Sequence, residues 1–530
     1  MAIVGIACGF IIFIILWLSF GRIELALSAF LPMVIGWMCI GGIMHLLGIP
    51  LNTVNSVLAT VIFILGGIYT VFIVKGLISE YAYRKKVLSS YKNSIIVSAL
   101  IAFIGMGALI AAKHPAPYPL AGVTAAGMLT VMVTAWTVPP VIFGWLVNNM
   151  NQTRRTPATI GQFVRTGYCA VVYLIEIAIG CFLGVLTILY PWDKDRSKLW
   201  LHNIVYKVMR FNISHIWGVK TYIRNAANET FSGESIIISN HQSILDPIFI
   251  LALNPRIVMV VGGKVWSNPV VHVFFRFIGF INANQPIEKL TQDVENAIKK
   301  GYNVAIFPEG RRNVEEISRF HRGAFYMAQT LKVDIIPLYL HGVGHIMPKS
   351  SGFASRGQID LEVGTRIPYG MLSQYGSTPQ QIAFSIQESF IKHYDQMRKD
   401  IEDTHYFHDY VIGAYTYKGF SVGKKTRYLL SKYKDFSTWI DRDLSFEDES
   451  RTVTVYNSGL GHFPLLFALV HPDVEVYSYT YVPDEFALAT ACAHRPRNLH
   501  ICLGNKNGDT HSSHEAGIVY DYSQIVNDTQ

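Results

Sequence analysis

The chain has 530 residues, of which 51% are hydrophobic and only 15% charged, and its formal net charge is +8. Soluble globular proteins carry about a quarter charged residues, so this composition is rare for a soluble enzyme and favours a protein that lies partly in lipid. The length leaves room for more than one domain. The positive charge could serve nucleic acid or an anionic membrane. The sequence has a long apolar N-terminus and no nucleic-acid motif, so we expect a membrane and no nucleic acid as partner.

Five apolar runs in the first 150 residues are long enough to cross a bilayer, since about 20 helical residues span the hydrocarbon. Basic residues gather in alternate connections between them, at Arg22, at 84–86 and at 154–165. Such residues favour the cytoplasmic side, so Met1 is predicted to lie outside. We expect membrane helices over 1–150, with runs at about 3–20, 25–44, 56–78, 93–112 and 119–148.

A sixth apolar run, 168–190, lies in the basic linker 151–192 and decides on which side the rest of the chain lies. Glu176 lies near its middle, and Gly180 and Gly184 interrupt it. A carboxylate at the bilayer centre is costly, so the run is expected to be re-entrant or interfacial and to return to the cytoplasm. The alternative is a sixth ordinary crossing.

From residue 193 the pattern becomes that of a soluble α/β domain. Short apolar runs alternate with helical segments, which favours a largely parallel sheet covered by helices. Strands are expected at 235–239, 257–261, 303–307 and 334–340, and helices at 247–253, 287–300 and 323–331. Residues 401–450 are expected to form a helical linker. The predicted fold class is multi-domain, with an α-helical membrane bundle, an α/β domain over 193–400 and a small Rossmann-like α/β fragment over 451–530.

His241 and Asp246 follow the first predicted strand, in the sequence Ser-Asn-His-Gln-Ser-Ile-Leu-Asp-Pro. In a chain with 18 histidines such a pair is expected by chance about once, so the spacing alone is weak evidence. A histidine held by a carboxylate can act as a general base. Asp246 could also cap the helix that Pro247 begins, and the two roles are compatible.

A turn at 305–313, Ala-Ile-Phe-Pro-Glu-Gly-Arg-Arg-Asn, presents one acid and two bases. Glu309 can orient a hydroxyl or an arginine, and Arg311 and Arg312 can fork onto phosphate oxygens. The turn is a candidate anion cradle. Taken alone, it would also fit a solvated surface turn.

In order and spacing, these blocks resemble those of the lysophosphatidic acid acyltransferase superfamily, the PlsC-like 1-acylglycerol-3-phosphate acyltransferases, over about 193–400. The family's block of Asn-His, four residues and Asp is matched by Asn240, His241 and Asp246. Its Phe-Pro-Glu-Gly-x-Arg block is matched at 307–312, and its apolar strand with a proline at Pro337.

The resemblance implies transfer of a fatty acyl group from acyl-CoA or acyl-carrier-protein to a hydroxyl of lysophosphatidic acid or a related lipid. His241 would take the proton of that hydroxyl, and Asp246 would fix the tautomer of the His241 ring. No metal and no cofactor beyond the acyl donor would be needed. The catalytic domain would face the cytoplasm from the inner (plasma) membrane, with acyl-carrier-protein as a candidate partner. The residues implied in substrate binding are Asn240, Glu309, Gly310, Arg311 and Arg312, with Lys264 as a further candidate.

The second family block is incomplete here. It usually ends with an arginine that helps to hold the acceptor phosphate, whereas 279–285, Gly-Phe-Ile-Asn-Ala-Asn-Gln, has none. Lys264 or Arg276 is a candidate for the missing charge, and the identity of the acceptor stays open.

Two other interpretations of nearby residues are less favoured. Ser243 could form an acyl-serine, but no glycine-flanked nucleophile elbow surrounds it. His341 and His345 could bind a metal from one helix, but the glycines between them favour a loop and no third ligand is nearby.

The two flanking regions resemble other families. On the motifs at 20–27 and 47–52, the membrane helices over 1–150 resemble the last five helices of an RND-type, MMPL-like lipid exporter. Residues 65–69 lack that family's aspartate, so a working pump is not expected. Residues 453–461 and 474–477 resemble the start of a methyltransferase that uses S-adenosylmethionine, in a degenerate form without the ribose-binding acid. The rival function is a component of a lipid export system that acylates a specialised lipid.

Overall fold

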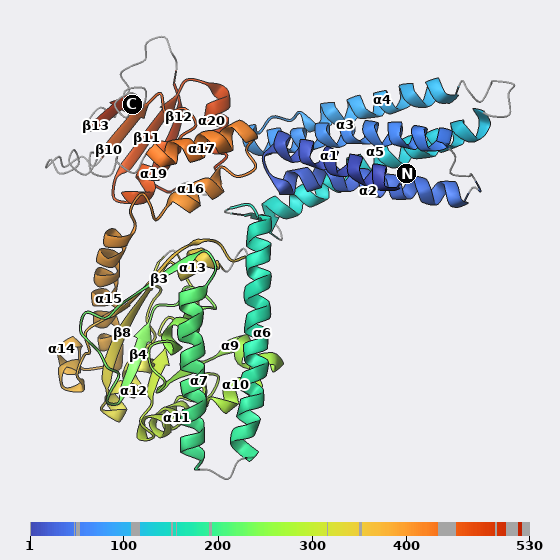
Figure 1. The fold of residues 1–530 in the computed structure, drawn as a ribbon. Coiled ribbons are helices and arrows are strands. Elements are labelled where there is room, and N and C mark those ends of the chain that lie inside the picture. The colour runs from blue at the N-terminus through green and yellow to red at the C-terminus, as the bar shows by residue number, and fades with distance from the viewer. Residues whose placement is uncertain are drawn as a thin grey trace. The chain divides into compact units, whose positions relative to one another are not determined.

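A computed structural model of the protein describes residues 2–46, 48, 53–107, 117–149, 152–154, 156–189, 193–314, 316–348, 352–432, 452–492, 496–504 and 518–521. The chain divides into two compact units, one of Met1–Ile160 with Asp403–Gln530 and one of Gly161–Glu402 (Figure 1). We call them the outer unit and the inserted unit, because the second interrupts the sequence of the first.

The outer unit begins with apolar helices. Five helices of the described chain are long and apolar enough to cross a membrane, four of them in this unit. They are α2 (Ile23–Leu46), α3 (Thr53–Tyr83), α4 (Leu88–Gly107) and α5 (Pro117–Val147), while the fifth, α6 (Ile160–Leu189), belongs to the inserted unit except for its first residue. The helix α1 (Ala2–Phe20) is apolar as well and has 19 residues. The predicted runs from 25 to 148 correspond to candidate spans, and the run predicted at 3–20 corresponds to the apolar helix α1.

Glycines let the helices of the outer unit approach closely. A Cβ on Gly66 of α3 would lie 2.6 Å from Cγ1 of Val131 in α5, and a Cβ on Gly127 of α5 would lie 2.9 Å from Cδ1 of Ile62 in α3. Helices in lipid associate through such close packing, because lipid tails give them no hydrophobic driving force.

The C-terminal part of the outer unit is a small α/β layer. Four strands form an all-parallel sheet in the order β12-β11-β10-β13. Their bounds are β10 (Thr452–Tyr456), β11 (Glu475–Thr480), β12 (Leu499–Leu503) and β13 (Ile518–Asp521), with helices α16 (His408–Ala414), α17 (Phe420–Lys432), α19 (His462–Val470) and α20 (Pro483–Thr490). The predicted alternation of strand and helix is present, and its assignment as Rossmann-like stays a prediction. The linker expected at 401–450 is helical over α16 and α17, and 433–450 lies outside the described residues.

Polar contacts hold this C-terminal part at one end of the helices. Nη2 of Arg22, in the turn between α1 and α2, donates to Oγ1 of Thr416 at 3.1 Å. The Tyr417 hydroxyl donates to the Ala158 carbonyl oxygen at 2.6 Å. The backbone N–H of Ile160 donates to Glu24 at 2.8 Å. The segments that precede and follow the inserted unit are therefore held together at the α1–α2 end of the outer unit.

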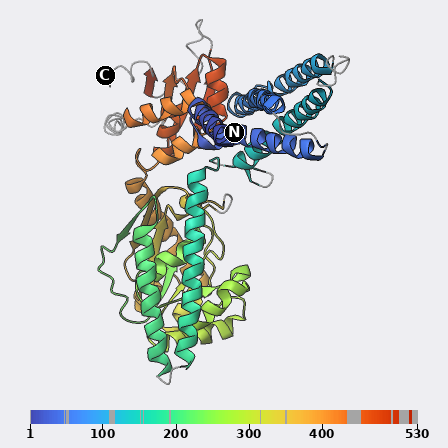
Figure 2. The ribbon, with the colours of Figure 1, turned by 45° about the vertical axis from the view of Figure 1, so that its right-hand side comes forward.

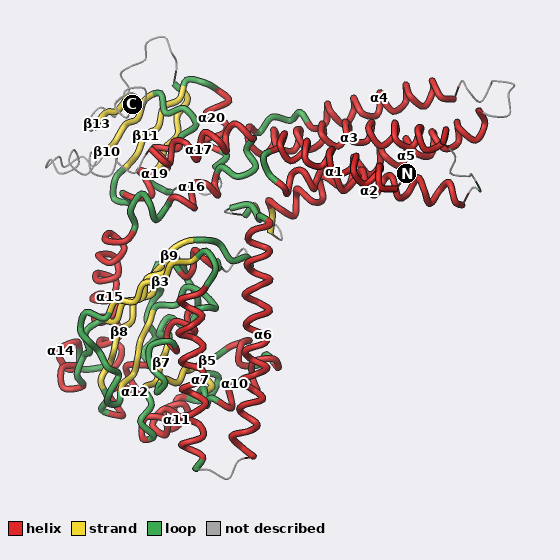
Figure 3. The backbone as a smooth tube through the Cα atoms, in the orientation of Figure 1, coloured by secondary structure: helices red, strands yellow, loops and turns green. Residues whose placement is uncertain are grey.

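The inserted unit is built on a seven-stranded mixed sheet in the order β3-β9-β8-β4-β7-β5-β6 (Figure 3). Only the β8–β9 pair is antiparallel among the described strands of this sheet. Their bounds are β3 (Val219–Arg224), β4 (Ser235–Ser239), β5 (Ile257–Val261), β6 (Ile281–Asn282), β7 (Asn303–Ile306), β8 (Asp334–His341) and β9 (Gly357–Val363). All four predicted strands are present, and β3, β6 and β9 were not predicted. Because β4 to β8 are mutually parallel, the loops that follow them lie at one edge of the sheet.

Both faces of this sheet are covered. Ile237 belongs to a core that includes Phe249 of α8 (Asp246–Leu251) and Leu201 of α7 (Lys194–His215), while Ile236 and Ile238 point the other way and are buried too. Strands β7, β4 and β8 are contacted by α11 (Ile287–Lys299), α12 (Gly323–Leu331) and α15 (Pro379–Ile401), respectively. The predicted helices at 247–253, 287–300 and 323–331 correspond to α8, α11 and α12.

The segment expected to be re-entrant is one continuous helix, α6, which lies beside α7 (Figures 1 and 2). Gly180 and Gly184 lie within this helix without interrupting it. They make room for two rings of α10, because a Cβ on Gly180 would lie 2.5 Å from the ring of Phe274, and one on Gly184 2.4 Å from that of Phe277. Glu176 accepts two hydrogen bonds of 2.9 Å from Asn212 of α7. A re-entrant segment must reverse its direction within the membrane, and a continuous helix does not, so the prediction of a re-entrant segment is wrong. An interfacial helix and a full crossing both stay compatible with α6.

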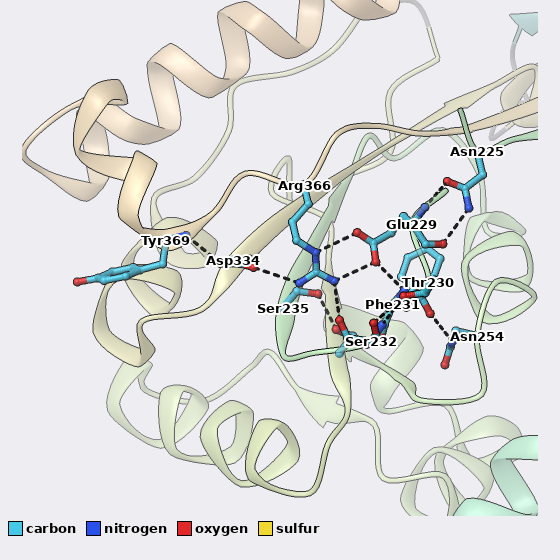
Figure 4. A network of polar contacts seen from close by, with 11 residues as sticks. Asn225, Glu229, Thr230, Phe231, Ser232, Ser235, Asn254, Asp334, Arg366 and Tyr369 are labelled. Carbon is cyan, nitrogen blue, oxygen red and sulfur yellow. Dashed lines mark hydrogen bonds and ion pairs between the residues drawn. The ribbon is translucent and has the colours of Figure 1, made fainter. Parts of the chain in front are cut away.

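A polar network fixes the amino ends of β4 and β8 (Figure 4). Arg366 binds Glu229 through Nε and Nη2, at 2.9 and 3.0 Å, and Asp334 through Nη1 at 3.2 Å. The hydrogen bonds from Arg366 hold the pKa of Glu229 below its usual value despite its burial. This network lies at the strand ends opposite to the loops that carry the candidate site.

Candidate active site

The candidate site collects residues from the loops that follow three parallel strands. His241 follows β4, the turn with Glu309 follows β7, and His341 ends β8. The loops that follow neighbouring parallel strands lie at the same edge of the sheet, so residues about 100 positions apart in sequence come together.

His241 and Asp246 form a hydrogen-bonded pair, as the sequence predicted. Nδ1 of His241 lies 2.7 Å from Oδ2 of Asp246, whose side chain is fully buried, whereas that of His241 is 19% exposed. Because the carboxylate accepts at Nδ1, this nitrogen carries the proton and Nε2 is the basic atom of the neutral ring. The ring stacks on Phe307, with centroids 4.0 Å apart and planes 13° apart, which fixes its orientation.

Asp246 holds the loop before it rather than the helix after it. Its Oδ2 also accepts backbone hydrogen bonds from Gln242 at 2.7 Å and Ser243 at 2.9 Å. Asp246 is the first residue of α8, and its side chain does not cap that helix, whose N-cap residue is Leu245. The capping role considered for Asp246 is therefore wrong, and the carboxylate is devoted to residues 241–243.

Glu309 positions the backbone of His241. Its Oε1 accepts from the His241 N–H at 2.8 Å and its Oε2 from the Ser318 N–H at 2.7 Å. Burial raises the pKa of Glu309, and these hydrogen bonds oppose the shift. The Asn313 N–H donates to the His241 carbonyl oxygen at 2.8 Å. Glu309 is thus a positioning residue, and its expected part in binding a substrate stays a prediction.

Asn240 has a positioning role as well, and its expected contact with substrate stays a prediction. Its amide donates to the Leu340 carbonyl oxygen and accepts from the Leu340 N–H, both at 2.8 Å, and the side chain is buried. This pairing ties the loop after β4 to β8. Gly310 has φ +66°, a conformation that favours glycine, so it shapes the turn that carries Arg311 and Arg312.

Arg311 and Arg312 remain available for an anionic ligand. Arg311 is exposed and Arg312 partly exposed, and neither has a hydrogen bond or ion pair with another described residue. The Lys264 side chain lies outside the described residues, although its backbone belongs to α9 (Gly263–Trp266). The Gly263 N–H donates to Oδ1 of Asn284 at 3.0 Å, so α9 adjoins the block that lacks the family's arginine. Arg276 is exposed at the end of α10 (Pro269–Phe277).

A buried polar chain behind His241 was not foreseen. Nε2 of Gln242 donates to the Tyr394 hydroxyl at 2.7 Å, and this hydroxyl lies 2.9 Å from Nδ1 of His341. Nε2 of His341 lies 3.2 Å from Oε1 of Glu402. Although burial raises it, the pKa of Glu402 is lowered to about 2 by His341 and Arg398. No sequence pattern marks Gln242 and Tyr394 as partners, because 152 positions separate them.

This chain bears on two alternatives considered from the sequence. Both ring nitrogens of His341 have partners in Tyr394 and Glu402, which gives His341 a role other than metal binding. The Ser243 hydroxyl is buried and donates to the Met347 carbonyl oxygen at 3.1 Å, so it is not presented as a nucleophile.

Known proteins are similar to part of this chain. Residues 219–341 match the Acyltransferase family. The chain is 26% identical over 170 residues to a chloroplastic 1-acyl-sn-glycerol-3-phosphate acyltransferase of Arabidopsis thaliana, covering 31% of this chain and 45% of that protein. It is 25% identical over 199 residues to 1-acyl-sn-glycerol-3-phosphate acyltransferase alpha of Homo sapiens, covering 35% and 68%.

A solved structure is also similar. The crystal structure of the 1-acyl-sn-glycerophosphate acyltransferase PlsC from Thermotoga maritima aligns with 45% of this chain and 98% of its own, at 16% identity and a TM-score of 0.39. The chain spans about half the length of the plant relatives that it matches. The family match identifies an acyltransferase domain within the inserted unit. The exporter-like and methyltransferase-like resemblances stay predictions.

Proposed function

We propose that this chain, whose inserted unit contains an acyltransferase domain, is a membrane-bound O-acyltransferase that acylates a hydroxyl of lysophosphatidic acid or a related lipid. The observation that carries the proposal is the His241–Asp246 pair, which leaves Nε2 of His241 as an accessible base within the residues that match the family. The names of the relatives support the class of acceptor.

The reaction follows from that geometry. Nε2 of His241 takes the proton of the acceptor hydroxyl as its oxygen attacks the thioester carbonyl carbon. Asp246 stabilises the imidazolium that results, since its carboxylate faces Nδ1. When the new C–O bond has formed, the C–S bond breaks and the thiolate takes the proton from Nε2. His241 thus returns to its starting state, and the reaction requires no metal or cofactor beyond the acyl donor.

Arg312 is assigned to the acceptor phosphate and Arg311 is a second candidate. Both follow Gly310 in the turn whose Glu309 binds the His241 backbone, so their chain segment adjoins the base. A planar guanidinium fork suits phosphate oxygens, and neither arginine is paired within the described chain. The thioester donor is acyl-CoA or acyl-carrier-protein.

The chain path supports a location of the inserted unit on the same membrane side as the α1–α2 turn. Ala158 and Tyr417 are hydrogen-bonded to each other, and Thr416 is hydrogen-bonded to Arg22 of that turn. The path from 158 to 417 must therefore cross the membrane an even number of times. Within the described residues of that path only α6 is long and apolar enough to cross. We infer that α6 does not cross, and the basic residues near the α1–α2 turn favour the cytoplasmic side for the inserted unit.

The proposal is tested by incubating the purified full chain with labelled acyl-CoA or acyl-carrier-protein and a panel of lysolipids. Mass spectrometry of the products identifies the acceptor. Formation of a diacylated phospholipid from one lysolipid is the expected result. Hydrolysis of the thioester without acylation of any panel member would contradict the proposal.

A further inference from the structure

A cavity next to the Glu309 turn is not used by the chemistry above. It has a volume of about 540 Å³ and lies between the segment 319–322 and the first turns of α15. Ligand pockets for small molecules commonly measure about 300–1,000 Å³. Its lining comprises Arg319, Phe320, His321, Arg322, Gln380, Gln381, Ala383, Phe384, Ser385 and Gln387.

The lining is basic and lacks a compensating acid. It contains two arginines, a histidine and three glutamines, but no aspartate or glutamate. The side chains of Arg319 and Arg322 are exposed, and neither forms a hydrogen bond or ion pair with another described residue. Unpaired guanidinium groups that converge on a recess favour an anion that presents several oxygens.

The wall that carries these cations is fixed in place. The Phe320 N–H donates to Gln387 of α15 at 3.2 Å, and Gln387 donates to the Ser318 carbonyl oxygen at 3.3 Å. The Phe320 ring is buried and packs against Phe390 of the same helix. The His321 N–H donates to the Pro308 carbonyl oxygen at 2.8 Å. The arginines are therefore presented by a backbone that needs no rearrangement on binding.

The cavity is connected to the base by a single carboxylate. Glu309 accepts from the His241 N–H and from the Ser318 N–H, and Ser318 precedes the first lining residue, Arg319. His241 itself does not line the cavity. A ligand bound here therefore needs a long arm to bring its reacting group to His241.

We propose that this cavity binds the phosphorylated nucleotide end of a coenzyme A thioester, an inference that rests on the proposed function. A nucleotide with phosphates on its ribose and in a diphosphate matches the two arginines. The Phe384 side chain is 61% exposed at the cavity and offers a face on which adenine can stack.

Two features favour the donor nucleotide over other phosphates. In lysophosphatidic acid the phosphate is only a few bonds from the reacting hydroxyl, so it must bind beside His241, where Arg312 is available. In coenzyme A the pantetheine arm separates the phosphates from the thioester. A recess of this size also suits a small molecule better than the surface of an acidic carrier protein.

Direct binding tests the proposal without turnover. Titration calorimetry on the full chain measures the Kd for coenzyme A, for the analogue without its 3′-phosphate and for pantetheine alone. Arg319→Ala and Arg322→Ala are each expected to weaken coenzyme A by about tenfold or more, the effect of one lost charge-assisted hydrogen bond, and to leave pantetheine unchanged. Lys392→Ala, which removes an exposed charge further along α15, is the matched control and is expected to bind like the wild type.

Steady-state kinetics give a second test through the KM values of the two substrates. Each arginine variant should raise the KM for acyl-CoA without changing the KM for the lysolipid. An unchanged Kd for coenzyme A, or no binding to the wild-type chain, would overturn the inference. A raised KM for the lysolipid alone would assign the cavity to the acceptor, and loss of acyl-carrier-protein use alone would assign it to that protein. If coenzyme A binds here but no lysolipid is acylated, the proposed function fails and the nucleotide site stands.

Discussion

Glu309 binds the backbone of His241: its Oε1 accepts the His241 N–H at 2.8 Å while its Oε2 accepts the Ser318 N–H at 2.7 Å. One buried carboxylate therefore joins the loop after β4 to the segment that follows the Glu309 turn. The acid acts on the position of the base, and the two arginines after it remain available for ligands.

Glu309→Gln should lower kcat by about tenfold, because the amide offers one acceptor and turns its NH₂ group toward the second N–H. The KM values for donor and acceptor should stay within about twofold, since both carboxylate oxygens of Glu309 bind backbone N–H groups. Glu316→Gln, a change of an exposed acid in the same loop, is the control. A raised acceptor KM with unchanged kcat would show instead that Glu309 contacts substrate.

Arg312→Ala should raise the KM for the phosphorylated acceptor by roughly tenfold or more and leave the KM for the donor unchanged. Arg312→Lys keeps the charge but loses the planar fork, so it should recover only part of the affinity. Initial rates at varied acceptor and varied donor separate the two effects. Equal losses toward both substrates, accompanied by a lower melting temperature, would make this arginine structural.

His202 should make the inserted unit sensitive to acid. Burial, aided by Lys198, lowers its pKa to about 4, and Nε2 lies 2.8 Å from the Ile278 carbonyl oxygen. The folded pKa is below the unfolded value, so the stabilisation is complete above pH of about 6.5 and is lost as the pH falls toward 4.

Over that pH range the free energy of unfolding should fall by about 3 kcal/mol, at about 1.4 kcal/mol per pKa unit. Denaturant unfolding of the full chain between pH 7 and 4.5 measures it. His202→Gln should flatten the curve, because its amide can still donate to Ile278 but does not titrate. Parallel curves for the two proteins would refute this role of His202.

One cysteine in the inserted unit and one in the outer unit test the membrane path. Arg196→Cys, just after α6, and Lys424→Cys, in α17 of the outer unit, both replace exposed residues. In a background without the native cysteines, both should react with a membrane-impermeant thiol reagent only after the inner membrane is opened. Protection of one and labelling of the other in intact spheroplasts would mean that α6 crosses the bilayer.

The elements with a strong apolar pattern could be predicted from sequence. The strands at 235–239 and 257–261 coincide with β4 and β5, because short apolar runs between polar residues are typical of buried strands. Strands β3 and β9 were missed, although Val219, Thr221 and Ile223 alternate with polar residues in the manner of a half-buried edge strand.

Only part of the candidate site could be predicted from the sequence. The pairing of His241 with Asp246 could be foreseen because side chains five positions apart carry it. The partners of Glu309 and Asn240 are backbone groups 68 and 100 positions away, and a backbone N–H leaves no mark in a sequence. The even number of crossings likewise depends on contacts such as that between Tyr417 and Ala158, which no local pattern encodes.

Nε2 of His241 is proposed to be the general base of an acyl transfer, and the turnover of His241→Ala tests this role most directly. The full chain carrying this change should insert, bind donor and melt like the wild type, because the His241 backbone groups that bind Glu309 and Asn313 remain. Its rate of lysolipid acylation should fall by at least about a hundredfold. A rate within a few fold of the wild type would contradict the proposed mechanism.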